Sequence, residues 1–267
     1  MTQPKVIILR TAGTNCDKET AFAFEAAGAK TDFVHINELT RRSFGEKDLF
    51  SYQIMALPGG FTYGDDIASG KILANELKFK LEEKLQRFVK NGNLIIGICN
   101  GFQILVKAGL LPNLSGDYQM IESTLTLNDS DKFEDRWVYL KTVSGHSKCV
   151  WTKGINHIIE LPVAHGEGKF IPKDKKVLSR LKSENLIVFE YVNEKGQRAE
   201  YPLCPNGSIE NIAGICDPSG RIFGLMPHPE RHIHRWQHPC WTRNTAKETG
   251  DGFAIFKNGV EYAKKYL

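Results

Sequence analysis

The stretch Leu94-Ile-Ile-Gly97-Ile98-Cys99-Asn100-Gly101-Phe102-Gln103-Ile-Leu105 reads as a buried strand, a sharp turn and the start of a helix. Two glycines flank the cysteine in a Gly-x-Cys-x-Gly spacing, which is the nucleophile-elbow spacing with cysteine in place of serine. A tight, strained turn of this kind lifts the side chain above the edge of a sheet. The glycines remove Cβ atoms that would clash with neighbouring backbone. The stretch therefore predicts an α/β fold with Cys99 as a nucleophile at the end of a strand.

Strands and helices alternate through the first hundred residues. Apolar strands are expected at Lys5 to Arg10, Lys30 to Ile36, Gln53 to Leu57 and Leu94 to Ile98. Helices are expected at Asp17 to Ala27 and at Lys71 to Lys90, the second with Leu73, Leu77, Leu81, Leu85 and Phe88 at helical spacing. Nearly all-apolar strands are typical of a mostly parallel sheet with helices on both faces. Ligands of such sheets bind beyond the carboxyl ends of the strands, here after Leu57 and Ile98.

The alternation weakens after Pro112. Strand-like runs at Trp137 to Val143 and Leu186 to Val192 indicate a small antiparallel extension, and Asp217 to Gly220 reads as a turn between two more strands. The chain closes with a helix whose stripe is Phe253, Phe256, Val260, Ala263 and Leu267. No repeat or linker interrupts the pattern, so we expect one domain over residues 1–267.

Composition excludes several functional classes. The net charge of +4, from 35 basic and 31 acidic residues, does not favour nucleic acid or a membrane surface as a partner. No apolar run is long enough for a transmembrane helix, and the N-terminus lacks a secretory pattern, so we expect a cytoplasmic protein. The six cysteines are widely spread, which predicts free thiols rather than a zinc or disulfide framework.

The position of Cys99 favours its reactive form. The positive end of a helix dipole and the unpaired N–H groups of the first turn stabilise thiolate over thiol. The Asn100 N–H is placed to hold a developing oxyanion. The alternative is a small buried apolar residue in a core strand, and this alternative is the interpretation kept for the other five cysteines.

A thiol nucleophile needs a base, and the base needs an orienting group. Among eight histidines, His228 follows a predicted strand and has a proline on each side. In an extended segment Glu230 would point to the same side and could hold the imidazole. A satisfied loop histidine is the alternative. A metal site is another interpretation of the cluster His228, His232, His234, His238 and Cys240. Their spacing fits no common zinc pattern, so no metal is expected.

A cysteine elbow followed far downstream by His-x-Glu resembles the class I glutamine amidotransferases. Leu57 to Asp65, Gly97 to Gln103 and Pro227 to Arg231 carry this resemblance. Four segments resemble more narrowly the glutaminase subunits of phosphoribosylformylglycinamidine synthase: Gly13-Thr-Asn-Cys-Asp17, Gly59-Gly-Phe-Thr-Tyr-Gly-Asp65, Pro162-Val-Ala-His-Gly-Glu-Gly168 and Pro205-Asn-Gly-Ser208 with Asn211-Ile-Ala-Gly214.

The resemblance implies a flavodoxin-like fold and a role for each matching residue. Cys99 would be the nucleophile, His228 the base and Glu230 its orienting group. The N–H groups of Gly60 and Asn100 would form the oxyanion hole, and Gln103 would help to hold the substrate glutamine. The implied activity is hydrolysis of glutamine to glutamate and ammonia through a thioester.

The resemblance also implies partners. Ammonia would go to an ATP-dependent synthetase subunit that converts formylglycinamide ribonucleotide to formylglycinamidine ribonucleotide in purine synthesis, in a complex with a small accessory subunit. This chain has no Gly-x-x-x-x-Gly-Lys-[Ser/Thr] phosphate loop, so no cofactor is expected on it, and ATP and magnesium are expected on the synthetase.

Two segments depart from the family pattern, and three rival interpretations stay open. Asp66 to Ile72 differs from the usual form, and the tail from His232 to Gly252 is longer than in compact members. The rivals are a glutaminase of another pathway, a cysteine hydrolase or chaperone-like protein, and a non-catalytic interaction subunit. The Pro205 to Ser208 segment argues against the first. Asn100 argues against the second, since those proteins tend to have histidine there, and the intact triad argues against the third.

Overall fold

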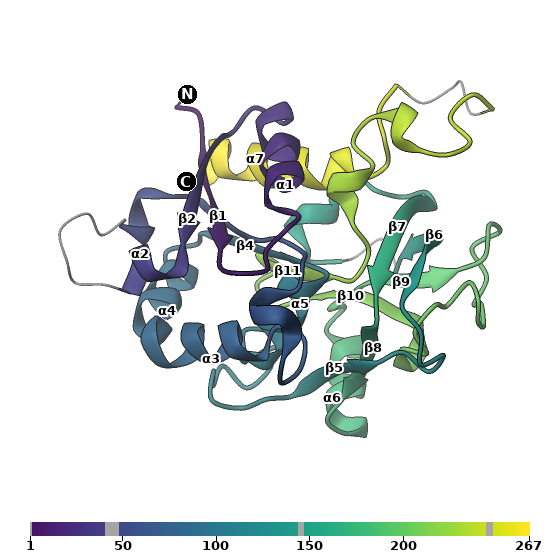
Figure 1. The fold of residues 1–267 in the computed structure, drawn as a ribbon, viewed down its shortest axis with the longest axis horizontal. Helices are drawn as coiled ribbons and strands as arrows, with labels where there is room; N and C mark the ends of the chain where they lie inside the picture. The colour runs from purple at the N-terminus through teal and green to yellow at the C-terminus, as the bar shows by residue number, and fades with distance from the viewer. Residues whose placement is uncertain (1, 41–47, 144–146, 244–247) are drawn as a thin grey trace.

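A nine-stranded mixed sheet runs through the molecule in the order β2-β1-β3-β4-β11-β10-β9-β6-β7 (Figure 1). The computed structural model describes residues 2–40, 48–143, 147–243 and 248–267. The strands of this sheet are β1 (Lys5–Arg10), β2 (Lys30–His35), β3 (Ile54–Leu57), β4 (Leu94–Ile98), β6 (Glu134–Thr142), β7 (Ile159–His165), β9 (Ile187–Val192), β10 (Ile212–Cys216) and β11 (Ile222–Leu225). A separate antiparallel ribbon pairs β5 (Ser123–Leu127) with β8 (Glu167–Pro172).

Strand directions decide which residues meet at the edge of the sheet. β2, β1, β3, β4 and β11 are parallel, whereas β10, β9, β6 and β7 each run antiparallel to the neighbour before them. Two reversals restore the original direction, so β9 and β7 end at the same edge as β4 and β11. The predicted α/β class is confirmed, and its antiparallel extension is a four-stranded half of the sheet.

Helices cover both faces because the central strands are buried on both sides. All side chains of β3, β4, β10 and β11 are buried. Figure 1 shows α1 (Asp17–Ala26) and α7 (Phe253–Tyr266) together on one face, and α3 (Lys71–Lys80), α4 (Glu82–Lys90) and α5 (Asn100–Lys107) on the other. The shorter helices are α2 (Ile36–Thr40) and α6 (Lys175–Ser183). The 3-10 turns are η1 (Leu49–Ser51), η2 (Thr62–Asp65), η3 (Val150–Thr152), η4 (Ile209–Asn211), η5 (Pro229–Arg231) and η6 (Arg235–Gln237).

The helix predicted over Lys71 to Lys90 is wrong as one element, because the chain bends at Leu81. There φ is −126° and ψ is 5°, which separates α3 from α4. A repeat of four residues drifts by about 40° per step on a helix with 3.6 residues per turn. A straight helix would therefore rotate part of the leucine stripe away from the sheet. The bend allows Leu73, Leu77, Leu81, Leu85 and Phe88 all to be buried.

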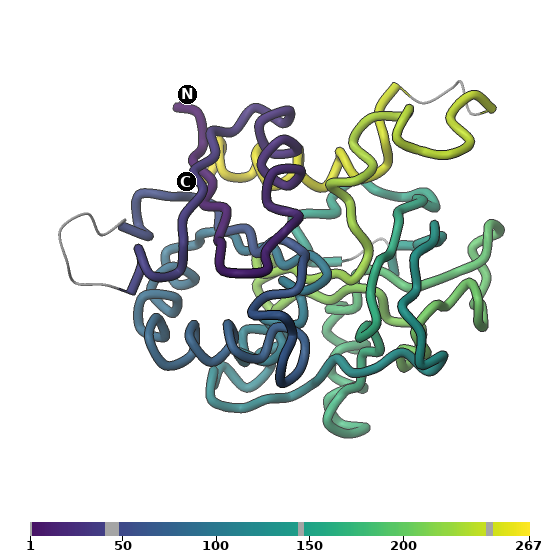
Figure 2. Tube along the Cα trace, viewed as in Figure 1, coloured from purple at the N-terminus to yellow at the C-terminus, as the bar shows by residue number. Residues whose placement is uncertain are grey.

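The parallel half of the sheet takes β1 to β4 from the first hundred residues and β11 from residues 222–225, and the antiparallel half comes from the segment between them. Figure 2 shows the first hundred residues, purple to blue, on one side and the teal to green segment on the other, while yellow α7 returns to α1. Buried apolar residues of both halves form one cluster. On α7 the predicted stripe holds at Phe256, Val260 and Ala263, but Leu267 is 41% exposed. Among the described residues, no helix has the length and apolar character needed to span a membrane.

Candidate active site

Cys99 stands between β4 and α5 in a strained conformation. Its φ is 51° and its ψ is −106°. Such a conformation costs a non-glycine residue on the order of 1–3 kcal/mol. A Cβ on Gly97 would lie 2.5 Å from the Gly101 carbonyl oxygen, and one on Gly101 would lie 1.9 Å from the Leu57 carbonyl oxygen. The elbow predicted from the glycine spacing is therefore confirmed.

The thiol of Cys99 faces the end of β7. Its Sγ lies 3.7 Å from the Ala164 carbonyl oxygen, and the residue is 5% exposed. Cys99 is the N-cap of α5, so the first N–H groups of this helix, including that of Asn100, have no acceptor within the helix. These donors lie beside the sulfur, where an oxyanion would form.

The side chain of Asn100 fastens the loop after β3 to the nucleophile helix. Thr62 Oγ1 donates to Asn100 Oδ1 at 2.8 Å, and Asn100 Nδ2 donates to Asp65 Oδ1 at 3.1 Å. Gly60 precedes these contacts with a φ of 145°, and a Cβ there would lie 2.7 Å from the Gly13 carbonyl oxygen. The loop that carries Gly60 is thus held on both sides by close backbone packing and by hydrogen bonds.

Gln103 connects α5 to β8. Its Nε2 donates to the Glu167 carbonyl oxygen, and its Oε1 accepts from Asn100 Nδ2 at 3.1 Å. The Glu167 carboxylate accepts from the Ser69 N–H at 3.3 Å. This last contact places the Asp66 to Ile72 segment, which departs from the family pattern, against the start of β8. The amide of Gln103 therefore fixes the Glu167 backbone in place.

His228 and Glu230 form a buried pair after β11. His228 Nδ1 and Glu230 Oε1 are 2.6 Å apart, and each residue is 1% exposed. The expected extended segment is wrong, because Pro229–Arg231 forms the 3-10 turn η5. The turn still brings the carboxylate to the imidazole, so the expected contact is present although its local geometry differs.

Opposing effects set the protonation of His228. Burial acts to lower the pKa of its imidazole, but the charge of the Glu230 carboxylate and that of the Cys99 thiolate raise it, and the pKa lies well above 6.5. In the part of the chain that the structure describes, Nε2 of His228 is buried without a hydrogen-bond partner. His228 thus offers a proton at Nε2 on the side away from Glu230.

Cys16 joins this site, although no role at the site was predicted for it. A sulfur, nitrogen and oxygen atom of Cys16, His228 and Glu230 lie within 4.8 Å of one another, and Arg231 Nη2 donates to Cys16 Sγ at 3.2 Å. Burial raises the pKa of the Cys16 thiol above 9.0. The signal available in the sequence was position: Cys16 follows β1, whose carboxyl end neighbours that of β3.

Among the described residues, one group of side chains is placed so that it could hold a metal ion, and this group includes His228 and Glu230. That group is Cys16, His228 and Glu230. The tail histidines make separate contacts instead. His238 Nε2 lies 3.0 Å from Glu160 Oε2, His232 Nδ1 lies 2.7 Å from the Glu160 carbonyl oxygen, and the His234 ring stacks on Trp236. Residues 244–247 of the long tail lie outside the described residues.

The Pro205 to Ser208 segment makes hydrogen bonds to β8 and β9. Ser208 Oγ accepts from the Phe170 N–H at 2.9 Å, and Asn206 Nδ2 donates to the Tyr191 hydroxyl at 3.2 Å. The charge of Cys99 is among the influences that raise the pKa of Tyr191, after burial and Cys204. This segment therefore holds β8 and the end of β9 in place.

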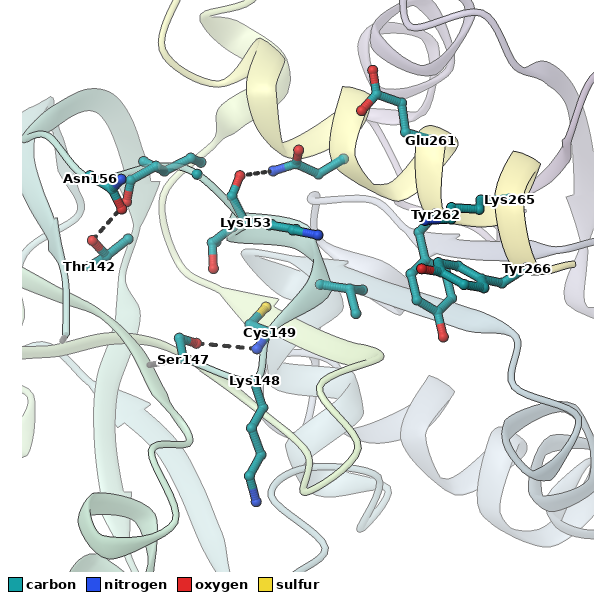
Figure 3. A pocket seen from close by; sticks show the side chains of 15 residues that line it. Thr142, Ser147, Lys148, Cys149, Lys153, Asn156, Glu261, Tyr262, Lys265 and Tyr266 are labelled. Carbon is teal, nitrogen blue, oxygen red and sulfur yellow. Dashed lines mark hydrogen bonds between the residues drawn. The ribbon is translucent and has the colours of Figure 1, made fainter. Parts of the chain in front are cut away.

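Two large cavities lie apart from this cluster. One of about 560 Å³ is lined by η3 and α7, and Figure 3 shows Lys153, Tyr262 and Tyr266 around it. Another of about 650 Å³ borders Tyr201 and Ser208. The residues that line them do not include Cys99, His228 or Glu230.

Comparison with known proteins gives similarities to a family model, to related sequences and to a solved structure. The family model described as "CobB/CobQ-like glutamine amidotransferase domain" matches residues 3–263. The phosphoribosylformylglycinamidine synthase subunit PurQ of Dehalococcoides mccartyi is 52% identical over 266 residues, covering 99% of this chain and 100% of that protein. The PurQ subunit of Methanococcus maripaludis is 46% identical over 274 residues, covering 98% of each. A chain in the structure of PurLQS from Thermotoga maritima has a TM-score of 0.71 and 30% identity, covering 98% of this chain and 99% of that one.

Proposed function

The chain belongs to the CobB/CobQ-like glutamine amidotransferase family, among the glutaminase subunits of phosphoribosylformylglycinamidine synthase, and we propose that Cys99, His228 and Glu230 carry out its glutamine hydrolysis. The observation that carries the proposal is a cysteine at a strained helix N-terminus at the same sheet edge as a buried histidine–carboxylate pair. We also propose that residues 1–267 act as one domain.

In the first step the Cys99 thiolate attacks the side-chain carbonyl carbon of glutamine. The carbonyl oxygen becomes an oxyanion, which accepts hydrogen bonds from the Gly60 and Asn100 N–H groups. Donors preorganised for such a charge are worth about 10²- to 10³-fold in rate each. Gln103 contributes by fixing the Glu167 backbone, which we propose forms part of the wall of the glutamine site.

In the second step His228 gives its Nε2 proton to the amide nitrogen. The C–N bond breaks, ammonia leaves, and a γ-glutamyl thioester remains on Cys99. Water then attacks the thioester carbonyl while His228 accepts one of its protons. The C–S bond breaks and glutamate leaves. His228 keeps the proton taken from water, which restores the starting pair of Cys99 thiolate and charged His228 imidazole. Glu230 stabilises the His228 imidazole whenever it is positively charged.

The ammonia serves a synthetase subunit in purine synthesis. The PurLQS structure is an assembly in which a similar chain has partners, and we propose the corresponding synthetase and small accessory subunit for this chain. ATP and magnesium would bind to the synthetase, where formylglycinamide ribonucleotide is aminated. We further propose a cytoplasmic location, since ATP and the nucleotide substrate are available there.

The test compares glutamate release by the wild type, Cys99→Ala and Cys149→Ala, with and without synthetase, ATP and formylglycinamide ribonucleotide. Cys149 is a matched control because it is a buried free thiol away from the triad. We expect Cys99→Ala to abolish release and Cys149→Ala to retain it. Equal release from the wild type and Cys99→Ala would overturn the nucleophile assignment. Release that does not rise with the complete complex would overturn the pathway.

A further inference from the structure

His165, at the carboxyl end of β7, is a second buried imidazole near the nucleophile. The residue is 3% exposed. Its Nδ1 lies 3.1 Å from Asn128 Oδ1, and its Nε2 is buried without a hydrogen-bond partner within the described ranges. Burial of a polar atom without a hydrogen-bond partner is unfavourable. His165 Nε2 is therefore an unused hydrogen-bonding atom.

Asn128 determines which nitrogen of His165 carries the proton. Asn128 Nδ2 donates to the carbonyl oxygens of Lys132 and His165, at 2.9 and 2.8 Å. Its Oδ1 accepts from the Gly168 N–H at 2.9 Å, so Oδ1 is the atom that faces the imidazole. An amide oxygen only accepts, so Nδ1 of His165 must donate. Nε2 then carries a bare lone pair.

His165 stays neutral at physiological pH. Burial, followed by the positive charge of His228, lowers its pKa from 6.5 to about 3. A neutral imidazole with a proton at Nδ1 accepts a hydrogen bond at Nε2 and gives no proton there. Nε2 of His165 can therefore pair only with a hydrogen-bond donor.

The backbone on either side of His165 contacts the catalytic residues. The Ala164 carbonyl oxygen lies 3.7 Å from Cys99 Sγ, and the Pro162 carbonyl oxygen accepts from the His228 N–H at 2.8 Å. On the other side Gln103 binds the Glu167 carbonyl oxygen. The end of β7 thus contacts Cys99 and His228, and the start of β8 contacts Gln103 on α5.

We propose that His165 Nε2 accepts an N–H hydrogen bond from the carboxamide nitrogen of glutamine, and then from the ammonia that it becomes. The inference rests on the proposed glutaminase function. A bond to one N–H would turn the nitrogen lone pair toward His228 and make it more basic as the C–N bond breaks. Because Nε2 has no proton to give, the ammonia stays uncharged at this position.

The test compares hydrolysis of glutamine with hydrolysis of glutamate γ-methyl ester. The ester has the same acyl group, but its leaving oxygen carries no N–H. For His165→Leu we expect the ratio of amide to ester kcat/KM to fall about tenfold, the worth of one hydrogen bond. For His165→Gln, whose amide oxygen can accept in place of Nε2, we expect a ratio within about threefold of the wild type.

The outcomes separate this inference from the proposed function. Cys99→Ala should abolish both reactions, and failure there would overturn the glutaminase mechanism itself. If Cys99→Ala abolishes both but His165→Leu lowers amide and ester hydrolysis equally, only the role of His165 is overturned. Melting curves identify a variant that does not fold. In that case the ratio for Gly168→Ala, whose Cβ would lie 2.4 Å from His165 Cε1, decides the question.

Discussion

The two halves of the sheet each bring one buried histidine to the same edge, and the two imidazoles differ in their partners. His228 follows β11 in the parallel half and pairs with the Glu230 carboxylate. His165 ends β7 in the antiparallel half and pairs with the Asn128 amide oxygen. Burial lowers the pKa of both, yet only that of His228 ends well above 6.5. The charge of the partner therefore decides which histidine holds a proton.

Both imidazoles pack directly against a glycine. A Cβ on Gly59 would lie 2.7 Å from His228 Cε1, and a Cβ on Gly168 would lie 2.4 Å from His165 Cε1. Each ring thus lies directly against a glycine, where no other residue leaves enough room. The shared packing fixes the position of both rings, while the different partners assign them different chemistry.

The substitution Glu230→Gln is the strongest test of whether the charge of the partner decides which histidine holds a proton. His228 would then face an amide, as His165 does, and its pKa should fall because the stabilising charge is lost. We expect glutamine and ester hydrolysis both to fall about 10³-fold or more, as when a triad carboxylate becomes an amide. Glutamate release across the pH range measures this effect.

Glu160→Gln is the matched control, because Glu160 Oε2 lies 3.0 Å from His238 Nε2 outside the triad. We expect this variant to retain wild-type rates. A Glu230→Gln variant within about tenfold of the wild type would show that the carboxylate does not control His228.

Gly59→Ala tests the contact between the glycine and the imidazole of His228. The added Cβ would meet the imidazole and, at 3.2 Å, Cys16 Sγ, so the ring must move. Displacing a general acid–base group costs about 10²-fold, and both amide and ester hydrolysis should fall together. Gly166→Ala is the control, since its Cβ meets only Phe133 Cδ2, at 3.9 Å. Equal rates for Gly59→Ala and Gly166→Ala would contradict the prediction.

Local sequence predicted the parallel half of the site. The elbow at Cys99 depends on glycine spacing within one strand–turn–helix unit, and contact of His228 with Glu230 depends on two residues of separation. The bend at Leu81 could not be predicted in this way, because no glycine or proline marks it. Its cause is burial against the sheet, which the leucine spacing alone does not show.

The contribution of the antiparallel half could not be predicted from local patterns. The end of β7 reaches Cys99 because β7 runs in the same direction as β4, which depends on the pairings from β11 through β10, β9 and β6. Asn128, which sets the tautomer of His165, is 37 residues away in the chain. Cys16 depends likewise on the order of β1 and β3. Such contacts follow from topology, which the motifs do not encode.

The two histidines should also make opposite contributions to stability as pH changes. The pKa of His165 is about 3 when folded against 6.5 for a free imidazole, so the unfolded chain binds more protons between these values. Its contribution is therefore present above pH 6.5 and is lost as pH falls. One such group changes the unfolding free energy by about 1.4 kcal/mol per pH unit. The raised pKa of His228 acts the other way: its contribution is present below 6.5 and is lost as pH rises through the folded value.

Urea unfolding at pH 7, 6 and 5 measures this difference. Between pH 7 and 5 the wild type should lose about 2 kcal/mol more than His165→Gln, which has no imidazole at this position. The comparison cancels carboxylates that titrate in both proteins. Identical pH slopes would contradict a buried neutral His165.

Gly168→Ala is the smallest change and separates the two halves most finely. Its Cβ would displace the His165 ring and with it Nε2, while His228 and Cys99 keep their own contacts. We expect the ratio of amide to ester hydrolysis to fall about tenfold, with the loss mainly in the amide reaction. The Gly168→Ala, His165→Leu double variant should fall no further, because both changes remove the same hydrogen bond and such effects do not add. Losses that multiply in the double variant would mean that Gly168 acts on the backbone around Glu167, and that the glycine and the histidine serve the site separately.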